Sequence, residues 1–288
     1  MPVTIYQGFE KLRQNLEITG LQESTVSTRQ RTVREAVSSE MEVLDSFLTG
    51  SYRRSTMIAP LSQADIDIFI VLNPSYYAVD GQTSLLDRVR RVLLRTYTKT
   101  PAISRNGQAV TITFTDFKVD VVPGFYRTGG GYLIPDAILK RWIETDPKKH
   151  IGLWSDANRA HNGDLIPLIK MVKGWNRTHS SLLRSFHLET LILQILNNVR
   201  ISDFPSGVRY VFDKARTQVQ YTVADPAGYG GNVGAYLNTP DKMNEVTSRL
   251  ETACQRALEA ERLEQLGRTS QAYEKWRLIF GDYFPAYG

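Results

Sequence analysis

The alternation of apolar and polar positions separates a part of the chain typical of strands from a longer part typical of helices. Short apolar runs rich in Ile and Val predict strands, because such runs are too short for buried helices. These strands are expected at Leu44–Leu48, Asp65–Leu72, Val110–Thr115 and Phe117–Val122. Apolar positions spaced three and four apart predict an amphipathic helix over Thr83–Tyr97. The order strand, strand, helix, strand, strand indicates a mixed sheet backed by helices.

Helical periodicity dominates both ends of the chain. Before the first strand it predicts helices over Val3–Thr19 and Thr25–Glu42. After Pro147 the expected helices are Ala157–Asn176, Phe186–Val199, Val208–Val219, Thr239–Leu266 and Ser270–Phe280. We therefore expect an α+β protein with a core over residues 1–150 and a C-terminal helical lobe over residues 151–288. Because ligand sites often lie at domain junctions, the active-site cleft is expected between the two.

Two carboxylates lie inside one of the predicted strands, within an apolar run where charged residues are unusual. Successive strand side chains point to opposite faces, so Asp65 and Asp67 share one face and Ile66 points to the other. Buried carboxylates are unfavourable unless something cationic faces them. Mg²⁺ is commonly held by one or two carboxylates together with substrate phosphates. The pair therefore indicates a site for a divalent cation.

The dipeptide Gly50-Ser51 supplies a candidate phosphate site just after the first predicted strand. Glycine allows the backbone to approach a ligand closely, and the Ser hydroxyl with nearby amides can donate to phosphate oxygens. Two other glycine-rich segments, 129–131 and 228–234, do not follow a strand and open a helix, so we interpret them as a turn and a loop.

A third carboxylate lies in the last predicted strand. There Val119 and Val121 point one way and Asp120 points the other way. Asp120 would complete an acidic triad with Asp65 and Asp67 on adjacent strands. Two cations held by such a triad can activate an attacking hydroxyl and stabilise a leaving pyrophosphate, which is the chemistry of nucleotidyl transfer.

These motifs together resemble those of one enzyme superfamily. The stretch LTGSYRRSTMIAPLSQADIDIFIVL followed by FKVDVVPGF is similar to the hG[GS], DxD, D signature of the polymerase-β-like nucleotidyltransferases. Within them it resembles the cGAS/DncV-like (CD-NTase) group, which is related to the oligoadenylate synthetases. The resemblance runs from about residue 40 to 200. It implies a polymerase-β-like core in which Asp65, Asp67 and Asp120 hold two Mg²⁺ or Mn²⁺ ions.

The same resemblance extends to the helical part of the chain. IPLIKMVKGWN followed by RSFHLETLI is similar to the helix pair in which a Lys and a downstream Ser contact the donor triphosphate. It implies Lys173 first and Lys170 second, with Ser185, as triphosphate contacts beside Gly50 and Ser51. Solvated lysines and a helix-capping Ser185 are the structural alternatives. His187, between two apolar residues, is interpreted as a packed histidine rather than a general base.

The resemblance also implies a function. The chain would join NTPs, ATP among them, into a cyclic or short linear oligonucleotide second messenger used in bacterial antiphage (CBASS) signalling. Its effector would be reached through the diffusible product, and an activating protein, peptide or nucleic acid remains open. Tyr221 and Tyr229 are candidates for base stacking. They stand near the glycine-rich loop, although a core or surface role is the default for any tyrosine.

Two other functions are weighed against this one. A nucleotidyltransferase acting on an RNA end or on a protein would need an extended basic surface or a dedicated RNA-binding module. The net charge of +5 comes from 35 basic and 30 acidic residues spread along the chain, which gives neither. A catalytically silent nucleotide sensor would have no need of three carboxylates, so the intact triad argues against it.

Composition narrows the cellular setting and the cofactors. No apolar run is long enough to span a bilayer, and no secretory leader pattern opens the chain, so we expect a cytoplasmic protein without membrane contact. The single Cys254 cannot form an internal disulfide or a thiolate metal site. The four His are scattered without ligand spacing, so zinc is not expected.

Overall fold

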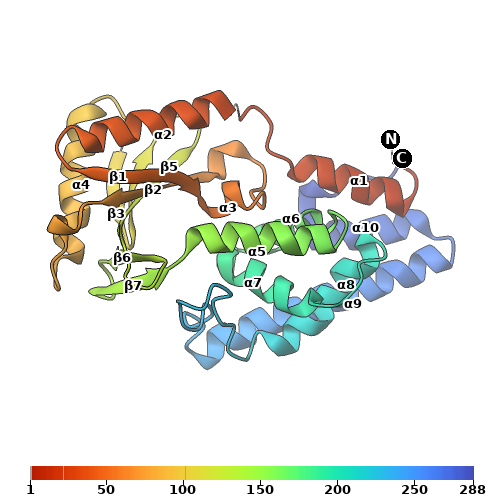
Figure 1. Cartoon of the computed structure of the whole chain (residues 1–288). Helices are drawn as coiled ribbons and strands as arrows, with labels where there is room; N and C mark the ends of the chain where they lie inside the picture. The colour runs from red at the N-terminus through yellow and green to blue at the C-terminus, as the bar shows by residue number, and fades with distance from the viewer. Residues whose placement is uncertain (1, 22, 101) are drawn as a thin grey trace. The chain divides into compact units, whose positions relative to one another are not determined.

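The computed structural model describes residues 2–21, 23–100 and 102–288 (Figure 1). The chain forms two compact units. The first comprises Ile18–Leu153 and carries the strands; the second comprises Met1–Glu17 together with Trp154–Gly288 and is helical. A mixed sheet with helices and a C-terminal helical lobe were predicted, and both are confirmed.

The first unit, called here the sheet unit, contains a seven-stranded sheet in the described part of the chain. Its strands are β1 (Val43–Thr49), β2 (Asp65–Leu72), β3 (Ala102–Asn106), β4 (Ala109–Thr113), β5 (Lys118–Tyr126), β6 (Tyr132–Asp136) and β7 (Arg141–Thr145). The main order is β1-β2-β5-β4-β3, and β6 and β7 extend from β5. Only the β2–β5 pair is parallel among the strands described.

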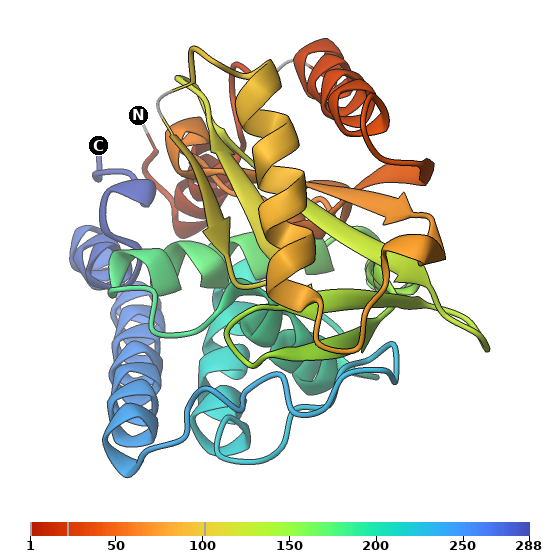
Figure 2. The same ribbon diagram turned by 90° about the vertical axis from the view of Figure 1, so that its left-hand side faces the viewer.

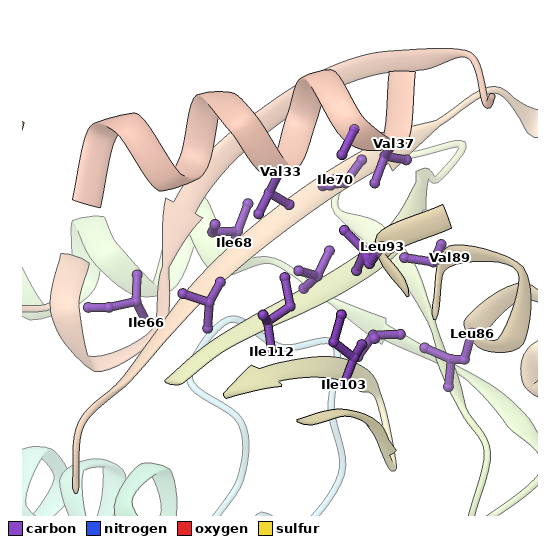
Figure 3. Packing of buried hydrophobic residues seen from close by; sticks show 14 of the residues in the cluster. Val33, Val37, Ile66, Ile68, Ile70, Leu86, Val89, Leu93, Ile103 and Ile112 are labelled. Atoms are coloured by element: carbon purple, nitrogen blue, oxygen red, sulfur yellow. The ribbon is translucent and has the colours of Figure 1, made fainter. Parts of the chain in front are cut away.

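Two helices cover one face of this sheet, and their apolar stripes explain why they do. Val33 and Val37 of α2 (Glu23–Ser38), and Leu86, Val89 and Leu93 of α4 (Gln82–Thr96), are buried in one cluster. They meet alternate β2 residues, including Ile66, Ile68 and Ile70, at the centre of the core (Figure 3). Figure 2 shows α4 crossing in front of the strands. The residues between these isoleucines therefore project from the opposite face.

The second unit, called here the helical unit, is built from helices at both ends of the sequence. Its members are α1 (Ile5–Leu16), most of α5 (Pro147–Ala160), α6 (Leu165–Thr178), α7 (Ser185–Leu196), α8 (Phe204–Gln218), α9 (Pro240–Gln265) and α10 (Thr269–Phe280). Phe9 of α1 makes edge-to-face contacts with Trp276, Phe280 and Phe284. This aromatic cluster, which a boundary drawn at residue 150 overlooks, ties α1 to the C-terminal helices.

Local predictions differ from the structure at two places with clear reasons. The helix predicted over Ala157–Asn176 is wrong, because α5 and α6 are separated by a tight turn. There Asn162 and Gly163 have positive φ values of 54° and 91°, which no continuing helix can accommodate. Strands β3, β6 and β7 were not predicted. Each has five residues; β3 and β7 are largely exposed or only partly buried, and β6 is buried but contains Pro135, which weakens a strand signal.

Other local predictions are confirmed. All three glycines of the segment 129–131 have positive φ and form the turn between β5 and β6. No helix among the described residues has both the length and the apolar composition that crossing a membrane would require.

Candidate active site

The alternation predicted for β2 is confirmed, and it places the first two carboxylates on the face away from the helices. Ile66 and Ile68 are buried against α2 and α4, whereas Asp65 is exposed and Asp67 is half-buried. The carboxylates therefore project from a face that this core does not fill. The strand keeps its apolar residues in the core while presenting two anionic side chains on its other face.

The parallel pairing of β2 with β5 brings the third carboxylate beside the second. In this register Asp67 is paired with Asp120, and Asp65 with Lys118. Paired positions on neighbouring strands present their side chains on the same face. The three aspartates predicted from the sequence therefore lie on one face of two adjacent strands.

Asp120 sits in an environment that disfavours its charge. Burial raises the pKa of the Asp120 carboxyl, and the neighbouring carboxylate of Asp65 raises it further. A hydrogen bond opposes these effects: Thr111 Oγ1 donates to Asp120 Oδ1 across 2.6 Å. Lys118 also lowers this pKa. Ionised Asp120 therefore favours positive charge beside it, which is the property expected of a cation ligand.

Thr111 is a site residue that the sequence analysis missed. It lies on β4 directly opposite Asp120 on β5, and it is buried. Its hydroxyl orients the carboxylate and leaves the second oxygen of Asp120 outside this bond. A threonine in a strand is ordinary, so only the antiparallel register of β4 and β5 could have identified it.

The position of Gly50 explains why a glycine precedes Ser51. Gly50 opens the four-residue helix α3 (Gly50–Arg53) directly after β1, and its φ is +66°. A Cβ atom at this position would lie 1.7 Å from Asp67 Oδ2. Thr49, the preceding residue, is paired with Asp67 in the sheet. The backbone at Gly50 thus passes against the carboxylate, and the half-buried Ser51 follows immediately.

The aspartates supply a suitable set of oxygen donors for a divalent cation. Within the described ranges, no group of three or more His, Cys, Asp or Glu side chains is already drawn together as a ligand cluster. Like-charged carboxylates repel each other when nothing positive lies between them. The shared face of Asp65, Asp67 and Asp120, and the environment of Asp120, nevertheless fit hard, oxygen-liganded cations.

The candidate lysines lie in the helical unit and are engaged in ion pairs. Lys173 Nζ donates to Glu189 Oε1 across 2.8 Å, and both side chains are buried. Lys170 Nζ donates to Glu17 Oε2 across 2.7 Å. The alternative of two solvated lysines is therefore wrong. Contact of either lysine with a triphosphate stays a prediction.

The start of α7 carries Ser185 and His187. Ser185 is exposed and is the first helical residue, whereas Arg184 holds the N-cap position, so the capping alternative for Ser185 is wrong. His187 is 1% exposed, and burial lowers its pKa to about 4. Its Nδ1 lies 2.9 Å from the Tyr236 hydroxyl, which accepts a hydrogen bond from the Arg184 amide. His187 is thus a neutral, packed histidine, as the sequence indicated.

The two candidate stacking tyrosines lie in the helical unit, beyond α8. Tyr221 is 70% exposed and Tyr229 is partly exposed in the glycine-rich loop. Their role in base recognition stays a prediction. The aspartates and Gly50-Ser51 belong to the sheet unit, while the lysines, Ser185 and both tyrosines belong to the helical unit. The cleft expected between the lobes also stays a prediction.

The site and the comparisons with known proteins indicate the same class of protein. A mixed sheet with two aspartates on one strand, a third on its parallel neighbour and a Gly-Ser turn against them defines a polymerase-β-like nucleotidyltransferase. The profile of the family described as Second Messenger Oligonucleotide or Dinucleotide Synthetase domain (SMODS) matches residues 1–158. The chain belongs to this family, within the cGAS/DncV-like nucleotidyltransferases.

Individual relatives extend the likeness over almost the whole chain. A cyclic AMP-AMP-AMP synthase of Acinetobacter sp. is 27% identical over 305 residues, covering 98% of this chain and 86% of the relative. The structure of Escherichia coli MS115-1 CdnC with ATP is 16% identical, with a TM-score of 0.78 over 98% of this chain and 99% of that one. Vibrio cholerae DncV cyclic AMP-GMP synthase is 17% identical, with a TM-score of 0.66 over 97% and 87% of the chains.

Proposed function

We propose that this chain joins NTPs, with ATP among them, into a cyclic oligonucleotide messenger at Asp65, Asp67 and Asp120. One observation carries the proposal. The parallel β2–β5 register sets Asp67 beside Asp120, and the backbone at Gly50 lies against Asp67. The relatives support the choice of product, since one is a cyclic AMP-AMP-AMP synthase and another structure holds ATP.

The residues of the sheet unit divide the work of the reaction. Asp65 and Asp67 would be ligands on the triphosphate side, and Asp120 a ligand on the side of the attacking hydroxyl. Divalent cations, Mg²⁺ or Mn²⁺, would activate that hydroxyl and stabilise the leaving pyrophosphate when bound there.

Gly50 and Ser51 would bind the donor triphosphate. Because Gly50 has no Cβ, the backbone can lie close to Asp67 and to phosphate oxygens at the same time. The Ser51 hydroxyl and neighbouring amides supply hydrogen-bond donors. Lys173 and Ser185 are proposed as further triphosphate contacts. For Lys173 this requires that part of its charge remains available beyond the pair with Glu189.

The cellular role follows from the product class. We propose that the messenger acts in bacterial antiphage signalling and reaches its effector by diffusion, with synthesis in the cytoplasm where NTPs are supplied. The structure of Escherichia coli CdnC in a complex with HORMA-deltaN, 15% identical to this chain, supports a protein as the kind of partner to seek.

The test is product analysis with matched variants. The purified chain is incubated with all four NTPs and Mg²⁺ or Mn²⁺, and phosphatase-resistant products are identified by mass spectrometry. We expect a short cyclic oligonucleotide containing AMP from the wild type and none from Asp65→Asn/Asp67→Asn. Asp87→Asn, on an exposed part of α4, is the control and should retain synthesis.

Folding of each variant is checked by circular dichroism and thermal unfolding. Cyclic product from the folded double variant would overturn the assignment of the aspartates. Incorporation of labelled nucleotide only into added RNA would overturn the assignment of the product.

A further inference from the structure

The helical unit contains a pocket of about 760 Å³ that shares no residue with the proposed reaction centre. Its walls come from α1, the segment that leads into α8, the end of α9, and Asp164. The volume lies within the range of about 300 to 1,000 Å³ typical of ligand sites. We call it the acidic pocket; its lining includes Tyr6, Phe9, Asp203, Phe204, Glu261 and Glu264.

The pocket combines aromatic rings with carboxylates. Phe204 is partly buried and Tyr6 is 73% exposed, whereas Phe9 is buried against Trp276. Exposed aromatic side chains next to a pocket are typical of sites that receive a partner. The apolar surface alone would suit many ligands, so the charge of the lining decides between them.

That charge is strongly negative. The lining holds five carboxylates, of Glu10, Asp164, Asp203, Glu261 and Glu264, and one arginine, Arg13. Two of the five are paired: Arg13 Nη1 lies 3.6 Å from Glu10, and Arg209 Nε lies 2.8 Å from Glu261. In the described part of the chain, Asp164, Asp203 and Glu264 make no ion pair. Three negative charges therefore lack an ionic partner, in a chain whose net charge is +5.

The pKa of Glu264 reflects the excess of carboxylates in the acidic pocket. Partial burial raises the pKa of the Glu264 carboxyl, and the carboxylates of Glu261 and Asp203 raise it further. A cation entering the pocket would relieve this repulsion. A nucleotide triphosphate would increase it. The acidic pocket is therefore unsuited to the NTP substrates.

The side chain that best combines these two features is arginine. Its planar guanidinium forms paired hydrogen bonds with carboxylates and stacks on aromatic faces, and lysine does neither as well. Carboxylates and rings line the same pocket here. We propose that the acidic pocket is a docking site for an arginine-bearing segment of a partner protein, with an apolar neighbour of that arginine resting on Tyr6 and Phe204.

The experiment uses the full chain and a defined probe. A fluorescein-labelled Leu-Arg-Arg-Leu amide is titrated by fluorescence anisotropy at physiological ionic strength, with Leu-Lys-Lys-Leu and Leu-Gln-Gln-Leu amides for comparison. We expect saturable binding of the arginine peptide and affinity at least about tenfold weaker for the other two. Asp203→Asn/Glu264→Gln should lower the affinity for the arginine peptide by about tenfold or more.

The variants are chosen to leave the fold intact. Asp203 caps α8 by accepting from the Ser206 amide, and asparagine serves equally well in that role. Glu259→Gln/Asp282→Asn makes the same change in charge outside the pocket and should bind like wild type.

Three results would overturn the proposal. One is equal binding of the arginine and lysine peptides, and another is an equal loss of affinity in both pairs of variants. The third is displacement of the arginine peptide by spermidine at concentrations no higher than those of unlabelled arginine peptide. Such displacement would identify a polyamine site instead.

Discussion

The candidate groups of the sheet unit and of the helical unit are held in opposite ways. In the sheet unit, Asp67 and Asp120 are placed by the backbone register of β2 and β5, and the like charge of Asp65 raises the pKa of Asp120. In the helical unit, Lys173 is held by an opposite charge, that of Glu189, and both are buried. Like charges therefore meet at the candidate site of the sheet unit, whereas opposite charges meet at Lys173 of the helical unit.

The two arrangements have different effects on the stability of the fold. Clustered carboxylates weaken a fold until a cation binds them. A buried ion pair contributes little net stability, yet the fold depends on both partners being present. We therefore expect substitutions in the sheet unit to affect synthesis more than stability, and substitutions of the buried pair to do the reverse.

The largest expected effect comes from breaking the buried pair. Lys173→Met leaves Glu189 buried without its cation, and this should lower the free energy of unfolding by about 3 to 5 kcal/mol. Lys173→Met/Glu189→Met should recover most of that loss, because both charges of the pair are removed together. Urea unfolding measures both. A single variant within about 1 kcal/mol of wild type would show that the pair is not a structural requirement.

The same double variant separates structure from chemistry. If Lys173 also contacts the donor triphosphate, the refolded double variant should remain deficient in synthesis, chiefly through a higher KM for ATP. Wild-type kinetics in a stable double variant would remove Lys173 from the list of triphosphate contacts.

The next effect is a pH dependence located in the helical unit. The pKa of His187 is about 4 in the folded chain and 6.5 ordinarily, so acidification between these values protonates the unfolded state first. Stability present above pH 6.5 is thus lost as the pH falls toward 4, by roughly 3 kcal/mol in all. Urea unfolding at several pH values gives the free energy of unfolding at each pH. This free energy should change less steeply with pH in His187→Gln than in the wild type. An unchanged slope would assign the dependence to other groups.

In the sheet unit, Gly50→Ala is expected to lower activity by a free energy similar in size to the His187 effect on stability. The added methyl group would overlap Asp67 Oδ2, so the carboxylate or the backbone must move by about 1 Å. A displacement of that size lowers synthesis by about 100-fold, equivalent to about 2.7 kcal/mol in the barrier. Steady-state rates measure the loss. Gly152→Ala, where a Cβ meets no atom within 4 Å, should retain activity.

The smallest effect concerns Asp120 in the absence of metal. Its pKa is raised in the folded chain, so its ionised form opposes folding, and stability is lost as the pH rises through that pKa. Asp120→Asn should therefore raise the unfolding temperature in EDTA at neutral pH. One kcal/mol corresponds to roughly 2 to 4 °C. A lower temperature for the variant would show that the carboxylate is not under this repulsion.

The metal response of Asp120→Asn gives an independent readout. Added Mg²⁺ or Mn²⁺ should stabilise the wild type and have less effect on the variant, because one ligand is lost. Equal stabilisation of both proteins would argue against Asp120 as a ligand.

The sequence was most informative where local periodicity decides geometry. The alternation around Asp65 and Asp67 predicted which face each side chain takes, and the structure confirms it for both. The ionic partners of Lys170 and Lys173 could not be predicted, because Glu17 and Glu189 lie on other segments. Helical spacing fixes which residues share a face but says nothing about what covers that face.

The pairing of strands was the second feature that the sequence could not predict. The face of Asp120 follows from its own strand, but its pairing with Asp67 and Thr111 depends on which strands are neighbours. The association of α1 with α10 has the same origin, since Phe9 looks like any apolar helix residue until Trp276 and Phe280 are brought to it. Short polar strands such as β3 and β7 were missed because cross-strand hydrogen bonds, rather than apolar pattern, hold them.

The packing of α1 on the C-terminal helices has a consequence for synthesis on the ribosome. α1 has its aromatic partners in α10, which follows the whole sheet unit in the sequence. The sheet unit, a continuous stretch from Ile18 to Leu153, can fold while the nascent chain is still growing. Until α10 has been synthesised, Phe9 must stay exposed or be shielded by a chaperone. The sheet unit can therefore be folded while α1 still lacks its aromatic partners.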